Sequence, residues 1–508
     1  MHMPGASLVP TPSMHSAMSK HGTGGHATAL VQGVLAALLS VAVSSCATPI
    51  PQALSSQMVP RLFEGPVTPS IKPMAEAAWW DEFGDPDLTA LIVRAQADNR
   101  DLAVAVARVM QSQAQVTIQR AVLLPQFGAQ ANRANSGCNG QSCLDFAGSR
   151  SIGLTFNATY ELDFWGMARD NVQAAKELLK AARFAKQSVA LMVTANVAEQ
   201  YFAVLATRRR IAIANDFMVA VSSLLEDIKL HVKAGAASRL DVAREEAQLE
   251  AVSALLPGLE TQERQALFTL AVLLGQPPEG FDVSARSLDE IRTPEVAAGL
   301  PSDLLSRRPD VAQAEASLAG AHANVDAARA AFLPQISLTA SGGFVSSAIG
   351  ALVRGSNFGY SYGATLLQTI FDGGRINGQR RLAEGVQKEF IASYQNAVLH
   401  AFADVETALV QVSNTRRTED HLRREEAAAR EAFGISQLQY RQGTADLLTV
   451  LQAQQTLYLA QDQRAQTALD NARAIVHLYE ALGGGWLEDP NERTQFAETS
   501  PTWKQHSK

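Results

Sequence analysis

Aromatic residues are scarce in this sequence, at 6% of 508 residues. Alanine, glutamine, leucine and glutamate are abundant instead, and all four are strong helix formers. The length alone would suggest about three or four compact domains. A protein built of long helices can have this many residues without forming several compact domains. The composition therefore predicts an elongated, mainly helical protein.

Excess positive charge and catalytic motifs are lacking too. The 43 lysines and arginines are outnumbered by 50 acidic residues, for a net charge of −7, and no basic stripe marks a nucleic-acid surface. There is no P-loop and no Gly-x-Ser-x-Gly motif, and His322 and His400 lack partners at metal-ligand spacing. We therefore expect no enzyme, no cofactor, no metal and no nucleic-acid partner.

The first 45 residues differ from the rest. They hold one charged side chain, Lys20, followed by a small, apolar stretch over residues 27–43 that is too short to cross a bilayer stably. The stretch ends in Val43-Ser44-Ser45-Cys46, which resembles a bacterial lipobox. We expect residues 1–45 to be a lipoprotein signal peptide and Cys46 to carry the lipid; a poor transmembrane anchor with an incidental cysteine is the alternative.

Two further cysteines, Cys138 and Cys143, lie in a run that is typical of a loop, Asn135-Ser136-Gly137-Cys138-Asn139-Gly140-Gln141-Ser142-Cys143. In an oxidising compartment they can form a local disulfide.

The remaining sequence repeats itself at a spacing of about 208 residues (443 − 235 = 208). The pairs of matching motifs are Leu124-Pro125-Gln126 with Leu333-Pro334-Gln335, Leu162-Asp163-Phe164-Trp165-Gly166 with Phe371-Asp372-Gly373-Gly374, Lys233-Ala234-Gly235 with Arg441-Gln442-Gly443, and Leu274-Gly275 with Leu482-Gly483. This order predicts an internal duplication. The expected divisions are a lipidated segment over 46–86, a first repeat over 87–275, an equatorial linker over 276–309, a second repeat over 310–487 and a polar tail over 488–508.

Each repeat begins with a helical segment, over 87–124 or 310–332, and continues with two segments of alternating polarity. These lie within residues 126–162 and 335–370, where apolar residues such as Phe127, Phe156 and Tyr362 alternate with polar or small ones. Such alternation predicts strands. One apolar face suits a barrel wall between lipid and water, although a soluble hairpin with one buried face would show the same pattern.

A very long helix is predicted next, over residues 167–233 and 375–441, with apolar residues at heptad-like spacing. At about 1.5 Å per residue, each would be roughly 100 Å long, which suits a tube that crosses a periplasm. Turns at Gly235 and Gly443 then lead into returning helices over 240–274 and 447–482.

The number of strands bears on the assembly. Four strands cannot enclose a usable lumen, because about eight are already needed for a barrel filled by side chains alone. Open sheet edges are not tolerated in lipid. If the strands span a membrane, several chains must share one barrel.

Several motifs together are similar to the TolC-like outer-membrane factor family. They are Trp79-Trp80-Asp81-Glu82-Phe83-Gly84-Asp85-Pro86-Asp87-Leu88, Glu161-Leu162-Asp163-Phe164-Trp165-Gly166, Leu305-Ser306-Arg307-Arg308-Pro309-Asp310-Val311, Phe371-Asp372-Gly373-Gly374-Arg375 and Tyr479-Glu480-Ala481-Leu482-Gly483-Gly484-Gly485-Trp486. With the lipobox, they resemble the lipoprotein branch of NodT and OprM relatives that serves resistance-nodulation-division pumps. The resemblance covers about residues 75 to 487.

The resemblance implies a homotrimer in the outer membrane that extends into the periplasm. Each chain would give four strands to a shared twelve-stranded β-barrel and its long antiparallel helices to a tunnel. An inner-membrane pump of the resistance-nodulation-division type and a periplasmic adaptor (membrane fusion) protein would complete the conduit. The chain would then be a passive, gated exit duct for small toxic compounds.

The resemblance also assigns roles to the helical tips. The tips that meet the adaptor correspond to Gly235, Leu240, Gly443 and Leu447. The closed tunnel end is narrowed in the family by a leucine, matched by Leu448, and one helical turn later by an aspartate, where this chain has Gln452. Asp446 or Asp241 could supply negative charge nearby, and closure by packing alone is the alternative.

Two rival functions remain at this point. A type I protein secretion duct would share the fold, but many such ducts lack a lipid anchor. A coiled-coil envelope lipoprotein without a pore would not need the four strand-like segments with Phe156, Tyr160, Phe358 and Tyr360 on alternating faces. The pump rather than the duct selects the cargo, so the sequence does not identify it.

Overall fold

The computed structural model describes residues 60, 63–64, 78–136, 149–235, 237–284, 288, 291–296 and 301–484. All of them belong to the larger of two units into which the chain divides, residues 53–508. Cys46, Cys138, Cys143, the expected signal peptide and the polar tail lie outside the described residues.

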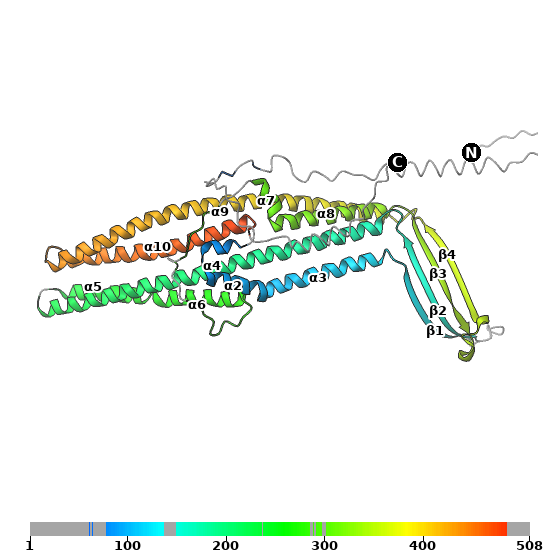
Figure 1. The fold of residues 1–508 in the computed structure, drawn as a ribbon, viewed down its shortest axis with the longest axis horizontal. Coiled ribbons are helices and arrows are strands. Elements are labelled where there is room, and N and C mark those ends of the chain that lie inside the picture. The colour runs from blue at the N-terminus through cyan, green and yellow to red at the C-terminus, as the bar shows by residue number, and fades with distance from the viewer. Residues whose placement is uncertain are drawn as a thin grey trace, which may run out of the picture. The chain divides into compact units, whose positions relative to one another are not determined.

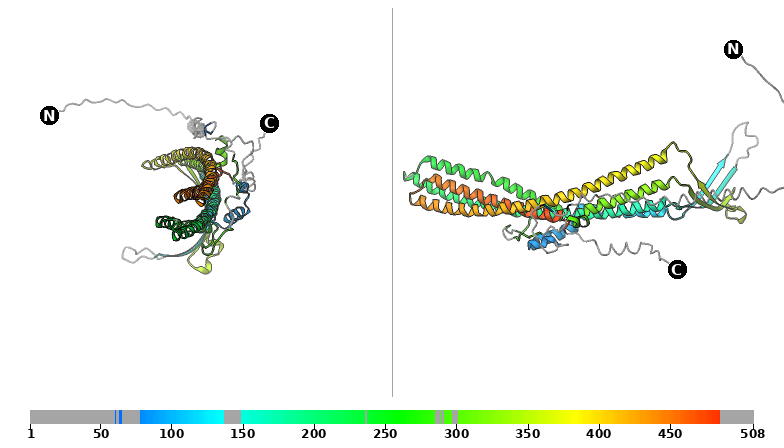
Figure 2. Two further views of the ribbon diagram at one scale, coloured as in Figure 1. Left: turned by 90° about the vertical axis from the view of Figure 1, so that its left-hand side faces the viewer. Right: turned by 90° about the horizontal axis from the view of Figure 1, so that it is seen from above.

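Two helices of 67 residues run through this unit (Figure 1). They are α4 (Met167–Lys233) and α9 (Arg375–Arg441), with the bounds that the sequence predicts. Towards the end away from the strands, α10 (Leu447–Ala481) returns along α9, and α5 (Arg239–Ser253) and α6 (Leu256–Leu273) return along α4. Towards the strands, α3 (Arg100–Ala121) packs on α4, and α8 (Pro309–Ala330) packs on both α4 and α9. The helices lie beside one another in a curved layer (Figure 2).

Two helices expected to be continuous are broken. The first returning helix ends at Ser253 and resumes at Leu256, with Pro257 in the first turn of α6. Proline has no amide hydrogen to donate within a helix and restricts the residue before it, so it starts a helix more readily than it continues one. Likewise the segment over 87–124 divides into α2 (Pro86–Asp98) and α3. The side chain of Asn99 accepts a hydrogen bond from Leu102 N there (2.9 Å) and caps α3.

The four strands form one antiparallel sheet in the order β1-β2-β3-β4. They are β1 (Gln126–Ser136), β2 (Ser149–Leu162), β3 (Gln335–Ser346) and β4 (Phe358–Leu367). The central pairing, β2 with β3, joins the two repeats. Strands of 10 to 14 residues are long enough to cross a bilayer at the usual tilt, which takes about 9–11.

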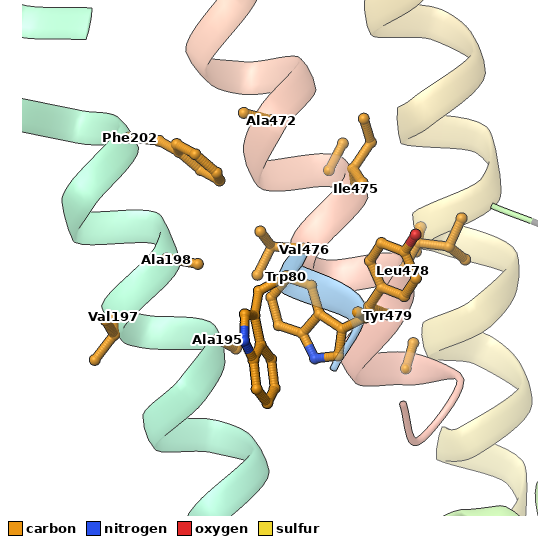
Figure 3. Packing of buried hydrophobic residues seen from close by; sticks show 14 of the residues in the cluster. Trp80, Ala195, Val197, Ala198, Phe202, Ala472, Ile475, Val476, Leu478 and Tyr479 are labelled. Carbon is orange, nitrogen blue, oxygen red and sulfur yellow. The ribbon is translucent and has the colours of Figure 1, made fainter. Parts of the chain in front are cut away.

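The largest hydrophobic core lies midway along the helices, where the described N-terminal part of the chain packs on α4 and α10. The 3-10 helix η1 (Trp79–Phe83) inserts Trp79, which is fully buried and stacks on Tyr479 with ring centroids 5.0 Å apart. Figure 3 shows Trp80, Phe202 and Val476 in this core. The most apolar 18-residue window of α4 would suffice by composition to span a membrane, but 67% of it is buried inside the protein. Its apolar character is therefore explained by packing.

The two repeats have matching backbones at their turns. Glycines 208 residues apart adopt nearly the same positive φ: Gly166 and Gly374 (91° and 91°), Gly235 and Gly443 (75° and 72°), and Gly275 and Gly483 (68° and 70°). A Cβ on Gly275 would lie 2.4 Å from the carbonyl oxygen of Asp98, and one on Gly483 would lie 2.5 Å from that of Arg307, the last residue of α7 (Pro301–Arg307). Both repeats thus need glycine where the returning helix ends.

Candidate functional site

The register of the sheet gathers the apolar residues on one face. Phe156 stands opposite Ala129 on β1 and Gly342 on β3, and Tyr362 stands opposite Ala340. The alternation that the sequence shows is therefore carried across all four strands. Large side chains also meet on this face, where the rings of Phe344 and Phe358 lie 5.2 Å apart between their centroids.

No described part of the chain covers this apolar face. Phe127, Tyr360 and Tyr362 are 81%, 75% and 83% exposed. A soluble hairpin would bury such a face on its own protein, because a large exposed apolar surface is costly in water. Within the described residues, no helix covers it, so the face is suited to contact with lipid.

The outer strands β1 and β4 lie at the two ends of the sheet. Their outward edges carry backbone N–H and C=O groups that need partners, and in hydrocarbon no water can supply them. Only pairing with strands of other chains meets this need, because the described part of the chain has no further strand.

Each long helix begins directly after a strand, at a carboxylate that caps it. Asp163 accepts hydrogen bonds from the amides of Ala168 and Arg169, both 2.9 Å. Asp372 accepts from the amides of Gly374 and Ile376, also both 2.9 Å. The N–H of Ile376 above all lowers the pKa of Asp372. Both aspartates thus cap the long helices, and no catalytic role is needed to explain them.

At the far end of the helices the chain reverses direction at Gly235 and Gly443. Both glycines have positive φ, and a Cβ at either would meet nothing within 4 Å. The tips are therefore open turns in which the backbone angle alone requires glycine. Of the leucines expected at the tips, Leu240 is 57% exposed and Leu447 only 7%.

The helix that follows each tip is capped by one carboxylate and one hydroxyl. In the first repeat the N-cap is Ser238, and its hydroxyl lies 2.8 Å from Oδ2 of Asp241 three residues later. In the second repeat the N-cap is Asp446, which accepts from Thr449 N (3.0 Å) and Thr449 Oγ1 (2.5 Å). The acid and the hydroxyl have exchanged places between equivalent positions.

The residues expected at the gate lie at the start of α10. Leu448 is 42% exposed and Gln452 is exposed, whereas their neighbours Leu447 and Val450 are buried. Leu448 and Gln452 thus point away from the hairpin's own core. Hydrogen bonds from Thr449 lower the pKa of Asp446, so this aspartate is ionised at neutral pH and its charge lies at the helix N-terminus.

The two tips lie close enough to interact electrostatically. Besides burial, the charges of Asp241 and Asp227 raise the pKa of Tyr440, which comes three residues before Gly443. Arg244 in turn helps to lower the pKa of Asp446. These residues belong to different hairpins, so patterns along one helix could not reveal their proximity.

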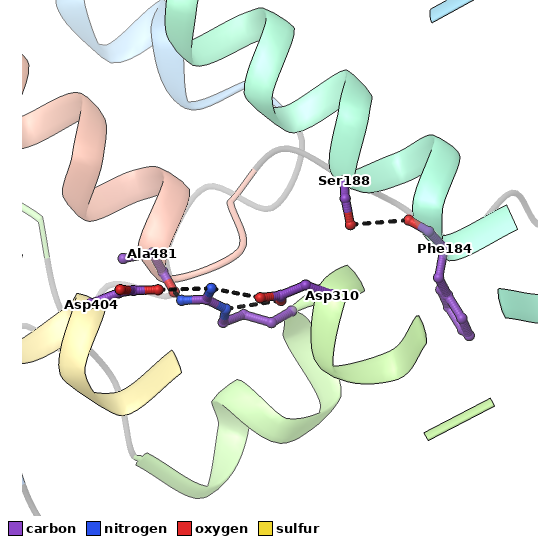
Figure 4. Close-up of polar contacts among 6 residues, drawn as sticks. Phe184, Ser188, Asp310, Asp404 and Ala481 are labelled. Atoms are coloured by element: carbon purple, nitrogen blue, oxygen red, sulfur yellow. Dashed lines mark hydrogen bonds and ion pairs between the residues drawn. The ribbon is translucent and has the colours of Figure 1, made fainter. Parts of the chain in front are cut away.

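A second polar cluster holds α8, α9 and α10 together midway along the unit. Arg308 pairs with Asp310 at 2.7 Å and Asp404 at 3.0 Å, and it also donates to the carbonyl of Ala481. Figure 4 shows the two carboxylates on either side of the guanidinium. Because the Arg308 side chain is only 11% exposed, both partners are needed to compensate for its desolvation.

Comparisons with known proteins agree with this geometry. A model of the outer membrane efflux protein family matches residues 91–276 and 300–484. The pyoverdine export outer membrane protein OpmQ of Pseudomonas aeruginosa is 40% identical over 81% of this chain and 88% of its own length. The toluene efflux pump outer membrane protein TtgC of Pseudomonas putida is 32% identical over 83% and 88%.

Among solved structures, the open state of the Neisseria gonorrhoeae MtrE outer membrane channel superposes with a TM-score of 0.79 at 30% identity, over 86% of this chain and 98% of that one. The matched stretches contain both long helices, all four strands and both tips. The chain therefore belongs to the outer membrane efflux protein family.

Proposed function

We propose that three copies of this chain form the outer-membrane exit duct of a tripartite efflux pump. The observation that carries the proposal is the open, four-stranded sheet with an uncovered apolar face, placed at one end of helices of 67 residues. Three such sheets close a twelve-stranded barrel without free edges. The helices then continue the conduit towards the inner membrane.

Exposed apolar residues on the helices near the sheet support assembly with further copies. On α3, Met110 and Ile118 are 67% and 60% exposed, and on α9 Leu382 is 68% exposed. These positions face away from the chain's own core, and lipid does not reach periplasmic helices. Neighbouring protomers are the partners that would cover them.

The tips are the proposed contact with the periplasmic adaptor. Gly235 and Gly443 leave open space around the turn, and Leu240 presents an exposed apolar side chain beside it. Leu448 and Gln452 would face the lumen and form the periplasmic gate, with Asp446 adding negative charge. The duct itself has no catalytic part in transport; the inner-membrane pump supplies the energy.

A lipid on Cys46 would anchor each protomer to the outer membrane. The proposal rests on the lipobox sequence that precedes Cys46. Cys46→Ser should abolish labelling with a radioactive fatty acid and leave uncleaved protein. Normal cleavage elsewhere with full recovery in the outer membrane would contradict the anchor.

The relatives favour a cargo of the pyoverdine kind. Two OpmQ proteins are 40% and 36% identical to this chain, against 32% for the toluene pump component. Replacement of OpmQ by this chain in Pseudomonas aeruginosa tests the idea. Restored pyoverdine in the culture medium would support it, whereas restored toluene tolerance alone, in a strain lacking TtgC, would point to solvent export.

The duct itself is tested with the purified protein. In mild detergent we expect a trimer by light scattering and, in planar bilayers, discrete channels. A monodisperse monomer without conductance would favour the envelope-rod alternative. Secretion of a protein substrate, with no effect on small-molecule accumulation, would favour a type I secretion duct.

A further inference from the structure

Glu245 occupies a core position of the first helical hairpin. The inward-facing residues of α5 and α6 recur at the alternating spacing of three and four that defines a coiled-coil seam. In order, they are Val242, Glu245, Leu249, Val252, Leu256 and Leu259. On α4, the buried residues Val221, Leu225 and Ile228 supply the other side of the hairpin core. An acid therefore stands where the seam otherwise has aliphatic side chains.

The Glu245 carboxyl group is fully buried and finds no partner in the part of the chain that the structure describes. The residue is 0% exposed, and neither Oε1 nor Oε2 has a hydrogen-bond partner among the described residues. An ionised carboxylate in such a position is strongly disfavoured, and it responds by taking up a proton.

The charged groups around Glu245 are engaged elsewhere. On the facing stretch of α4, Lys229 lies 3.3 Å from Glu226 and 3.7 Å from Glu246. Other charged or titratable groups on the stretches of helix at the tips include Asp227, His231 and Lys233 on α4, Asp241, Arg244 and Glu246 on α5, Tyr440 at the end of α9 and Asp446 at the start of α10. None of them contributes to the pKa of Glu245, which burial alone raises to about 7.

The second hairpin also has a buried acid, Glu426, but this carboxylate has hydrogen-bond partners. Glu426 on α9 is 8% exposed. It accepts hydrogen bonds from Arg430 and Arg464, both 2.7 Å, and from Gln461 at 3.4 Å. Burial raises the pKa of Glu426, but these donors outweigh it and lower the pKa below its ordinary value. The second hairpin thus stabilises the ionised form of Glu426, whereas the described residues of the first hairpin do not compensate for the burial of Glu245.

We propose that Glu245 is a proton-controlled latch of the first helical tip. When it is protonated, α5 packs on α4; when it loses the proton, that packing loosens and the tip is released. The packing itself does not depend on any assumption about transport. Its consequence for the adaptor contact at Leu240 does rest on the proposed function.

The direction of the pH effect follows from the raised pKa. The stabilisation of the packed tip is fully present below the ordinary glutamate value of 4.5 and is lost as the pH rises through about 7. Acid therefore tightens the tip, and neutral to alkaline pH loosens it.

Hydrogen exchange of the purified full-length trimer, followed by mass spectrometry at pH 5.5 and pH 8.0, tests the latch. Rates are corrected for the intrinsic pH dependence of exchange. In the wild type we expect protection of residues 239–253 to fall on the order of tenfold at the higher pH. Residues 447–461 of the second hairpin should not change. Glu245→Gln keeps the shape but cannot ionise, so its protection should not depend on pH.

Glu246→Gln is the matched control, because Glu246 is the next residue on the same helix but is exposed. It should keep the wild-type response. A wild type with equal protection at both pH values would overturn the proposal, as would a Glu245→Gln variant that still loosens at pH 8.0. If Glu245→Gln assembles poorly, the pH dependence of protection in the first hairpin of the wild type, compared with that in the second, still tests the proposal. Failure of the proposed channel function would appear as absent conductance and would not change these exchange rates.

Discussion

The hydroxyl of Tyr201 donates a hydrogen bond to Oδ2 of Asp85 over 2.8 Å, and both side chains are buried. Asp85 also caps α2 by accepting from Asp87 N at 2.9 Å. The bond therefore fastens the described N-terminal part of the chain to the middle of α4. A similar bond of 2.6 Å joins Tyr479 to Glu82, but Glu82 is exposed.

The difference in burial predicts a difference in stability. Tyr201→Phe removes a hydrogen-bond donor from the buried Asp85 carboxylate and should cost about 1.5–3 kcal/mol. Tyr479→Phe should cost less, about 0.5–1 kcal/mol, because water replaces the lost donor. Thermal unfolding of both variants measures the two losses of stability, and equal losses would contradict this prediction.

The sheet offers a test of close packing between β2 and β3. A Cβ on Gly343 would lie 2.3 Å from the carbonyl oxygen of Leu154 and 2.7 Å from Cα of Thr155. Gly343→Ala should separate the central strands, cost on the order of 1–3 kcal/mol and lower the yield of trimers in the outer membrane. Gly363→Ala is the control, since its Cβ meets only Thr339 Oγ1 at 3.7 Å. Normal yields for both would argue against the observed register.

The tip turn predicts a defect of function without unfolding. Gly443→Arg forces an L-residue into positive φ at about 1–2 kcal/mol but causes no clash. Trimers should form at normal abundance, yet efflux and co-purification with the adaptor should be lost, because a bulky side chain blocks close approach. Gly280→Arg, which meets the same kind of backbone angle (φ 70°) in open space after α6, should keep both. Full efflux in Gly443→Arg would place the adaptor contact elsewhere.

The gate is tested by conductance. Leu448→Ala removes an exposed side chain, so the stability should change by less than about 0.5 kcal/mol, while single-channel conductance in a planar bilayer should rise. Leu459→Ala truncates a leucine of similar exposure, 54%, eleven residues further along α10 (459 − 448 = 11), and should leave conductance unchanged. If both variants conduct like the wild type, Leu448 is not the constriction.

The long elements of this fold could be predicted because their limits are local. Glycines that must adopt positive φ stand at both ends of α4 and α9, so the sequence marks where these helices start and stop. The strands could be predicted equally well, because one face of the sheet carries the apolar side chains and the other carries polar or small ones, so polarity alternates along each strand. Pro257 lies within an otherwise helical pattern, so the pattern alone does not indicate the break between α5 and α6.

Contacts between hairpins could not be predicted in the same way. Tyr440 and Asp241 lie about 200 residues apart in the sequence (440 − 241 = 199), and neither stands out on its own helix. The burial of Glu245 is not evident from its neighbours, because Arg244, Glu245 and Glu246 together are typical of a solvated surface. Only the heptad register that continues from Val242 to Leu249 indicates that the middle residue of the three is buried.

The pairing of β2 with β3 also sets an order for folding. Leu162 pairs with Ile336, so this ladder joins positions 174 apart in the sequence (336 − 162 = 174), and the segment between them contains α4, α5, α6, α7 and α8. Contacts so distant in sequence form slowly, whereas helical hairpins form from near neighbours. A two-stranded hairpin is only marginally stable alone. The nascent chain can therefore form its helices early, but its sheet stays incomplete until the second repeat emerges. The most apolar surface of the protein is thus not assembled while the chain is still on its way to the membrane.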